Sequence, residues 1–169
     1  MPPSLTARRL HAQGISAPVA ASPAGALRHL GAMQALDYHA ALWAVGLRTQ
    51  GATRAQVEEA IERGEIVRTW PMRGTLHLLA REDVRWMVAL LAPRVQAANA
   101  ARIARDLGLD AAALTRGRHV VEKALAAGTP VTRSALYACM DAAAFASAPQ
   151  PDLHLLNWLA HEGAICQGP

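Results

Sequence analysis

Long hydrophobic runs, aromatic residues and cysteines are all scarce in this chain of 169 residues. No run of about 18 apolar residues occurs without a charge, so the sequence predicts no membrane-spanning helix. The seven aromatic residues are few for a β-sandwich or barrel, whose strands favour aromatic and β-branched side chains. The only cysteines, Cys139 and Cys166, cannot build a disulfide framework, so we expect a reducing, cytoplasmic setting.

Motifs of the common catalytic and cofactor-binding sites are missing as well. The seven histidines show no metal-binding spacing and have no paired carboxylates beside them. No glycine-rich phosphate loop and no Gly-x-Ser-x-Gly nucleophile motif occurs. The N-terminus has no apolar segment of the kind that secretory signals require. We therefore expect no metal, no cofactor and no covalent nucleophile.

The residues that are abundant favour helix and a weakly basic surface. Alanine occurs 38 times and leucine 21 times, and both are strong helix formers. The net charge is +4, and 16 of the 17 basic residues are arginine, which suits phosphate partners. This excess is spread evenly along the chain, so it permits a nucleic-acid partner without requiring one.

Capping residues and glycines divide the chain into short helices. The expected N-terminal caps are Thr6, Asp37, Thr53, Thr132 and Asp152, with a Thr53–Gln56 capping box. Helices are expected at 5–11, 24–30, 38–47, 54–63, 82–107 with a break or kink near Pro93, 118–127, 133–142 and 152–161, and a loop at 147–151. Two β-prone runs around a Pro/Gly turn predict a hairpin at 65–79.

Two helices followed by a hairpin outline a winged helix–turn–helix. A shift of 99 residues places Gly64 on Gly163 and Ile66 on Ile165, and it aligns two capped helices. The predicted fold is therefore mainly α with small β-hairpins, in two winged-helix units at 1–92 and 93–169. The second unit would stop before its wing. Chance similarity of two capped helices is the alternative explanation.

Three segments carry a family resemblance: LTARRL at 5–10, LDYHAALWAVGLR at 36–48 and IVRTWPMRGTLHL at 66–78. They resemble the bacterial winged-helix DNA-binding family that includes the AlkZ/YcaQ-like DNA glycosylases, which unhook interstrand crosslinks. The resemblance implies tandem winged-helix units. Because family members are longer, the chain is expected to correspond to an N-terminal portion.

The resemblance also implies where catalysis would occur. Those glycosylases use a Gln-x-Gln or Gln-x-Asp motif, and the matching stretch here has Gln34 at the first position and Leu36 at the second. Asp37 is polar but comes one residue late, which on a helix is a rotation of about 100°. Gln34 could equally be an amide that bonds nearby backbone, and Asp37 could be the N-cap of the next helix.

Candidate DNA contacts lie on the hairpin, on one helix and in a basic stretch. They are Arg68 and Arg73 beside the hairpin turn, Arg54 on the presumed recognition helix, Arg94, Arg102 and Arg105 in the stretch 94–118, and His77. Solvated arginines and a packed strand histidine are the alternative interpretations. Three glutamates, Glu58, Glu59 and Glu62, oppose phosphate binding by the Arg54 helix. The four tryptophans are expected in the core rather than stacked on bases.

Three functions remain open at this point. The first is a module that binds double-stranded, possibly damaged, DNA in the nucleoid. The second is an active glycosylase that excises alkylated bases, which Leu36 argues against. The third is a protein-interaction domain without nucleic acid.

Overall fold

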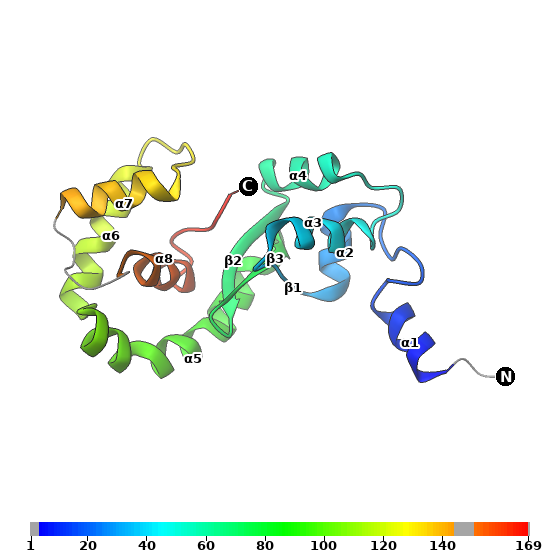
Figure 1. The fold of residues 1–169 in the computed structure, drawn as a ribbon, viewed down its shortest axis with the longest axis horizontal. Coiled ribbons are helices and arrows are strands. Elements are labelled where there is room, and N and C mark those ends of the chain that lie inside the picture. Colours follow the sequence, from blue (N-terminus) through cyan, green and yellow to red (C-terminus); the bar gives the residue numbers. More distant parts are fainter. Residues whose placement is uncertain (1–3, 144–150, 169) are drawn as a thin grey trace. The chain divides into compact units, whose positions relative to one another are not determined.

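The computed structural model describes residues 4–143 and 151–168 (Figure 1). Helices are α1 Leu5–Ala12, α2 Pro23–Leu30, α3 Tyr38–Gly46, α4 Arg54–Glu62, α5 Arg81–Leu107, α6 Ala111–Leu125, α7 Arg133–Ala142 and α8 Pro151–His161. Strands are β1 Met33–Gln34, β2 Ile66–Met72 and β3 Thr75–Ala80. Residues 4–88 with 166–168 form one compact unit, and Ala89–Ile165 forms a second. In the described ranges, no helix is both long and apolar enough to cross a bilayer.

Side-chain caps begin most of the helices as expected. The Asp37 carboxylate accepts a hydrogen bond from the Ala40 N–H at 2.9 Å, and Thr53 and Gln56 form the reciprocal capping box of α4. Thr132 caps α7. The cap expected at Thr6 is wrong, because Ser4 accepts the Ala7 N–H and Thr6 lies inside α1.

Two helices of the second half differ from the expected bounds. The cap expected at Asp152 is wrong, because α8 already begins at Pro151 and Asp152 lies in its first turn. Helix α6 begins at Ala111, seven residues before the expected start, because Asp110 caps it through the Ala113 N–H at 2.7 Å. Most of the loop expected at 147–151 lies outside the described residues.

The break expected near Pro93 is absent, and α5 continues through it. A proline inside a helix lacks the N–H that would bond the carbonyl four residues earlier, here Ala89. Both Pro93 and Ala89 are exposed, so water can satisfy the carbonyl that is left over. An exposed site thus accommodates a proline that a buried helix would not.

The predicted hairpin is confirmed as β2 and β3, and it gains a third strand. The antiparallel order is β1-β3-β2, with Met33 opposite Leu78 and Gln34 opposite His77. Arg73 and Gly74 at the turn both have positive φ, 54° and 66°, as in the tight turns that match the twist of a hairpin. Gln167 near the C-terminus also pairs with β2, since its N–H donates to the Arg68 carbonyl at 2.8 Å.

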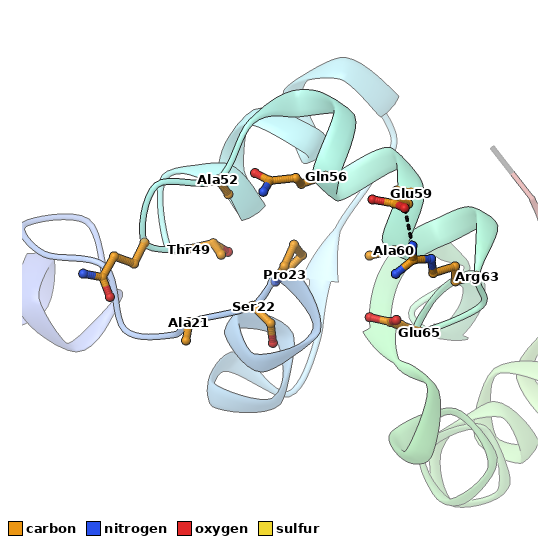
Figure 2. Close-up of a pocket in the computed structure, with 11 residues that line it drawn as sticks. Ala21, Ser22, Pro23, Thr49, Ala52, Gln56, Glu59, Ala60, Arg63 and Glu65 are labelled. Atoms are coloured by element: carbon orange, nitrogen blue, oxygen red, sulfur yellow. Dashed lines mark hydrogen bonds and ion pairs between the residues drawn. The ribbon is translucent and has the colours of Figure 1, made fainter.

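A small polar hollow separates the start of α2 from α4 (Figure 2). Its volume is about 200 Å³, and Ser22, Thr49, Gln56 and Arg63 are among the residues that line it. Arg63 is paired with Glu59 of the same helix, so its charge is already neutralised.

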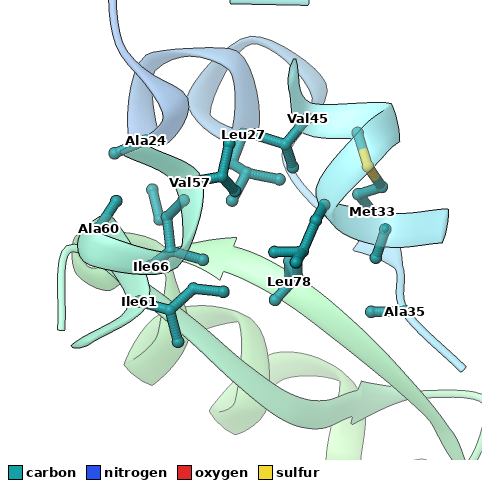
Figure 3. Close-up of a cluster of buried hydrophobic side chains, with 13 residues drawn as sticks. Ala24, Leu27, Met33, Ala35, Val45, Val57, Ala60, Ile61, Ile66 and Leu78 are labelled. Carbon is teal, nitrogen blue, oxygen red and sulfur yellow. The ribbon is translucent and has the colours of Figure 1, made fainter. Parts of the chain in front are cut away.

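Helices α2, α3 and α4 pack on one face of the sheet (Figure 3). The helix positions that recur every three or four residues are the buried ones, including Ala41, Leu42 and Val45 of α3. The rest of this core is Ala24, Leu27, Met33, Ala35, Val57, Ala60, Ile61, Ile66, Leu78 and Ala80. The sheet face that carries Met33 and Leu78 is therefore the inner face of the first unit.

The second unit has a separate core, and α4 and α8 end in the same way. Leu136, Met140, Leu155 and Leu159 are among its buried residues. Gly64 donates its N–H to the Ile61 carbonyl, and Glu65 donates to Ala60. After α8 the matching bonds run from Gly163 to Ala160 and from Ala164 to Leu159. Both glycines have positive φ, 66° and 70°, so the 99-residue shift in the sequence aligns two helix stops of the same kind.

Candidate nucleic-acid interface

The Gln34 segment is an extended strand, not part of a helix. Met33 and Ala35 are buried, whereas Gln34 and Leu36 are exposed. The Ala35 N–H donates to the Leu76 carbonyl at 2.8 Å, which continues the β1–β3 pairing past the strand. Side chains alternate across a strand, so Gln34 and Leu36 project from the same face, away from the core. The helical rotation expected between position 36 and Asp37 is therefore wrong.

Leu36 is unusually exposed for a leucine, at 61%. It stands two residues after Gln34 on the outer face, where it offers neither a donor nor an acceptor. Asp37 caps α3, because its Oδ1 accepts a hydrogen bond from the Ala40 N–H. One amide and one apolar side chain thus face solvent together.

Arg68 holds the backbone of this segment in place. Its Nε and Nη2 donate to the Ala35 carbonyl at 3.2 and 2.9 Å. Its guanidinium also lies 5.5 Å from the centre of the Tyr38 ring, within the range of a cation–π interaction. Arg68 is half-buried on β2, so the structure places this charge behind the Gln34–Leu36 segment rather than on an open hairpin surface.

His77 lies on β3 directly opposite Gln34 and is only 4% exposed. Its Nδ1 is 2.8 Å from the Thr75 carbonyl, which can only accept, so Nδ1 carries the proton. Burial lowers the pKa of His77 and keeps the imidazole neutral. This environment is that of a packed strand histidine, which was the alternative expected from the sequence.

The remaining arginines of the first unit differ in how far their charges are available. Arg73 is exposed at the hairpin turn. Arg54 is exposed but paired with Glu58 at 2.9 Å, one turn along α4. Glu58 and Glu59 therefore neutralise Arg54 and Arg63, in addition to the repulsion of phosphates expected from the sequence.

Three candidate arginines lie on α5, within the second unit. Arg94, Arg102 and Arg105 are all exposed, and eight- and eleven-residue spacings keep them on one side of a helix. Arg105 is paired with Asp106 at 2.8 Å, and Arg102 donates to Asn99 at 3.3 Å. Arg94 has no ion pair with any residue that the structure describes.

The chain's sequence matches the family model "DNA glycosylase AlkZ-like" over residues 27–169. The chain belongs to the AlkZ-like DNA glycosylase family. A solved structure with a similar fold is the DNA glycosylase AlkZ of Streptomyces sahachiroi, with a TM-score of 0.68 and 23% sequence identity. That alignment covers 95% of this chain but only 44% of the AlkZ chain. Among curated proteins, none matches the sequence.

Two tryptophans of this AlkZ-like chain contradict the expectation of core positions. Trp43 on α3 is 71% exposed and Trp86 on α5 is 51% exposed, whereas Trp70 is 6% exposed. Trp43 borders a hollow of about 430 Å³, together with His39, Leu47 and Arg54. Tryptophan is usually a core residue, but Trp43 lies opposite the buried stripe of α3, which is formed by Ala41, Leu42 and Val45.

Sequence reasoning missed the part that Arg68 plays for the site. No local pattern announces it, because Arg68 and Ala35 are 33 residues apart and meet only through the sheet. Among the described residues, no group of three histidine, cysteine or acidic side chains gathers in a way that could hold a metal.

Proposed function

We propose that this chain is a tandem winged-helix module that holds double-stranded DNA in an AlkZ-like DNA-repair protein. The observation that carries the proposal is the order α2–β1–α3–α4–β2–β3 with strand order β1-β3-β2. In this reading α3 and α4 are the helix–turn–helix and β2–β3 is the wing. The separate second core and the 99-residue shift in the sequence support a second unit, with the units at 1–92 and 93–169.

Phosphate contacts would come from the exposed arginines rather than from α4. Arg73 at the tip of the hairpin and the α5 arginines Arg94 and Arg102 are the best placed charges, whereas Arg105 would first have to leave Asp106. Arg54 would first have to leave Glu58. Arg68 and His77 would support the Gln34 segment without contacting DNA, because Arg68 bonds the Ala35 carbonyl and His77 is buried. Such contacts position a duplex without reading its sequence.

We expect base excision by this chain to be slow. An alkylated purine is a good leaving group, so a glycosylase mainly orients a water and stabilises positive charge on the sugar. Gln34 can supply one polar contact, but Leu36 occupies the outward position where the family motif places the second. Losing one oriented polar group in such a site typically costs about 10²–10³ in rate.

Duplex carrying N7-alkylguanine, assayed for abasic sites, tests this proposal. The unmodified chain should release the base little faster than an enzyme-free control. Leu36→Gln and Leu36→Asp should raise the rate, and Gln34→Ala in the same background should remove the gain. The chain should bind the duplex at low salt in every variant.

Two other functions would be indicated by different results. An active glycosylase is favoured by the exposed amide of Gln34, and it predicts rapid release that Gln34→Ala abolishes without any change at Leu36. A protein-interaction domain is favoured by the ion pairs that neutralise α4, and it predicts no duplex binding even at low salt.

A further inference from the structure

Helix α1 does not bury a single residue, which sets it apart from the helices that build the first core. Isolated helices of fewer than about 12 residues are marginal in water, because most helix stability comes from packing. Its eight residues gain a cap at Ser4, whose Oγ accepts the Ala7 N–H at 3.2 Å. One cap does not replace a packed face, so binding of a partner molecule to α1 would stabilise the helix.

The chain is anchored immediately after α1. Arg48 is only 8% exposed, and it donates from Nε to the Gln13 carbonyl and from Nη1 to the Ala44 carbonyl, both at 2.7 Å. Gly14 is buried at φ +65°, and a Cβ there would lie 2.9 Å from the Val19 methyl groups. This anchor and the His29 Nε2, 3.1 Å from the Ala12 carbonyl, hold the C-terminal end of α1 against the first unit and leave the side chains of the helix exposed.

The charge of this region has one sign. Arg8 and Arg9 are adjacent and exposed, and neither has an ion pair within the part of the chain that the structure describes. The first acidic residue of the whole sequence is Asp37, so no local carboxylate can neutralise them. On α4, by contrast, Arg54 is paired with a glutamate of its own helix.

The face that carries the two arginines suits an anionic partner. At about 100° per residue, Leu5, Arg8, Arg9 and Ala12 share one side of the helix. Leu5 and Leu10 are exposed but lie about 140° apart, so they form no continuous apolar stripe. A membrane surface or an apolar groove would require such a stripe, whereas a row of phosphates requires only the charges.

We infer that α1 is an arm whose Arg8 and Arg9 contact the phosphate backbone of the duplex held by the rest of the chain. This inference rests on the proposed DNA-holding function. The family match covers residues 27–169 and does not include α1, although LTARRL at 5–10 is one of the segments that resemble the family.

The test measures duplex affinity of the whole chain against KCl concentration. Each neutralised phosphate contributes about 0.9 to the slope of log affinity on log salt, so Arg8→Ala with Arg9→Ala should lower that slope by about 1.8. Lys123→Ala with Arg133→Ala removes the same charge from exposed residues of the second unit, and it should change the slope little. Because α1 buries nothing, the arm variant should melt at the temperature of the unmodified chain.

Hydrogen exchange gives a second readout. Amides of residues 5–12 should exchange rapidly in the free chain and slow when a duplex is added. The unmodified chain could bind duplex while the Arg8/Arg9 variant keeps the same salt slope and residues 5–12 of the unmodified chain stay unprotected. That result would overturn the arm but leave the proposed DNA-holding function intact. If the unmodified chain binds no duplex, the proposed function fails and the arm with it. If the Arg8/Arg9 variant loses binding to anionic lipid vesicles while its duplex binding is unchanged, the arm contacts lipid and the inference is wrong.

Discussion

Single residues decide how much of the candidate site is available to a ligand. Gln34 and Leu36 face outward, but the shape of their segment depends on Arg68, which belongs to another strand. The family resemblance pairs Gln34 with Leu36 two residues apart, and the structure exposes both side chains on one extended segment. The support from Arg68 and the neutral state of His77 could not be predicted, because both depend on burial and on contacts across the sheet.

The two hairpin arginines should behave differently when replaced. Arg68→Ala removes charge-assisted hydrogen bonds to the Ala35 carbonyl, and we expect the free energy of unfolding to fall by roughly 1–3 kcal/mol. Arg73→Ala is the matched control at an exposed turn, with a change within about 0.5 kcal/mol. Denaturant unfolding of both variants measures the difference. Equal stability of the two would contradict the role given to Arg68.

A second residue-scale prediction concerns the exposed tryptophan of α3. Trp43 is 71% exposed, so its indole should be quenched by acrylamide far more readily than that of Trp70, which is 6% exposed. Trp43→Phe should therefore remove a quenchable, red-shifted part of the emission, and Trp70→Phe should remove a protected part. If both variants lose the same component, Trp43 is covered in solution.

At the scale of helices and strands, the sequence predicted what is signalled locally. The caps at Asp37, Thr53 and Thr132 and the hairpin turn at Gly74 were expected because a few neighbouring residues specify each of them. Strand β1 has only two residues, too few for a periodic pattern, and it exists through its pairing with β3. Helix α5 passes Pro93 because that side of the helix is exposed, which no local pattern reveals.

The capping box of α4 should be measurable as stability. Thr53→Ala removes the acceptor for the Gln56 N–H, and caps of this type contribute about 1 kcal/mol. Thr6→Ala is a suitable control, because Thr6 lies exposed inside α1 and caps nothing. Thermal unfolding should separate the two variants, and a Thr6→Ala effect as large as that of Thr53→Ala would argue against the assigned caps.

At the scale of the whole molecule, each of the two units has its own core and its own buried histidine. Burial lowers the pKa of His77 in the first unit and the pKa of His161 in the second. His161 is 5% exposed, and its Nε2 has no hydrogen-bond partner among the residues that the structure describes. Both units therefore contain a side chain that folding keeps neutral, although one belongs to the sheet and the other to the end of α8.

These histidines predict that the chain loses stability in mild acid. Because the folded-state pKa values lie below the usual 6.5, both states hold the histidines neutral above that pH, and stability is full there. As the pH falls below 6.5 the unfolded chain takes up protons first, so the free energy of unfolding decreases until the folded-state pKa values are passed. Denaturant midpoints between pH 8 and pH 5 should show this decrease. His161→Leu should make the decrease shallower. A pH profile that is flat in the unmodified chain, or one that His161→Leu does not alter, would mean that His161 is protonated or solvated in the folded protein.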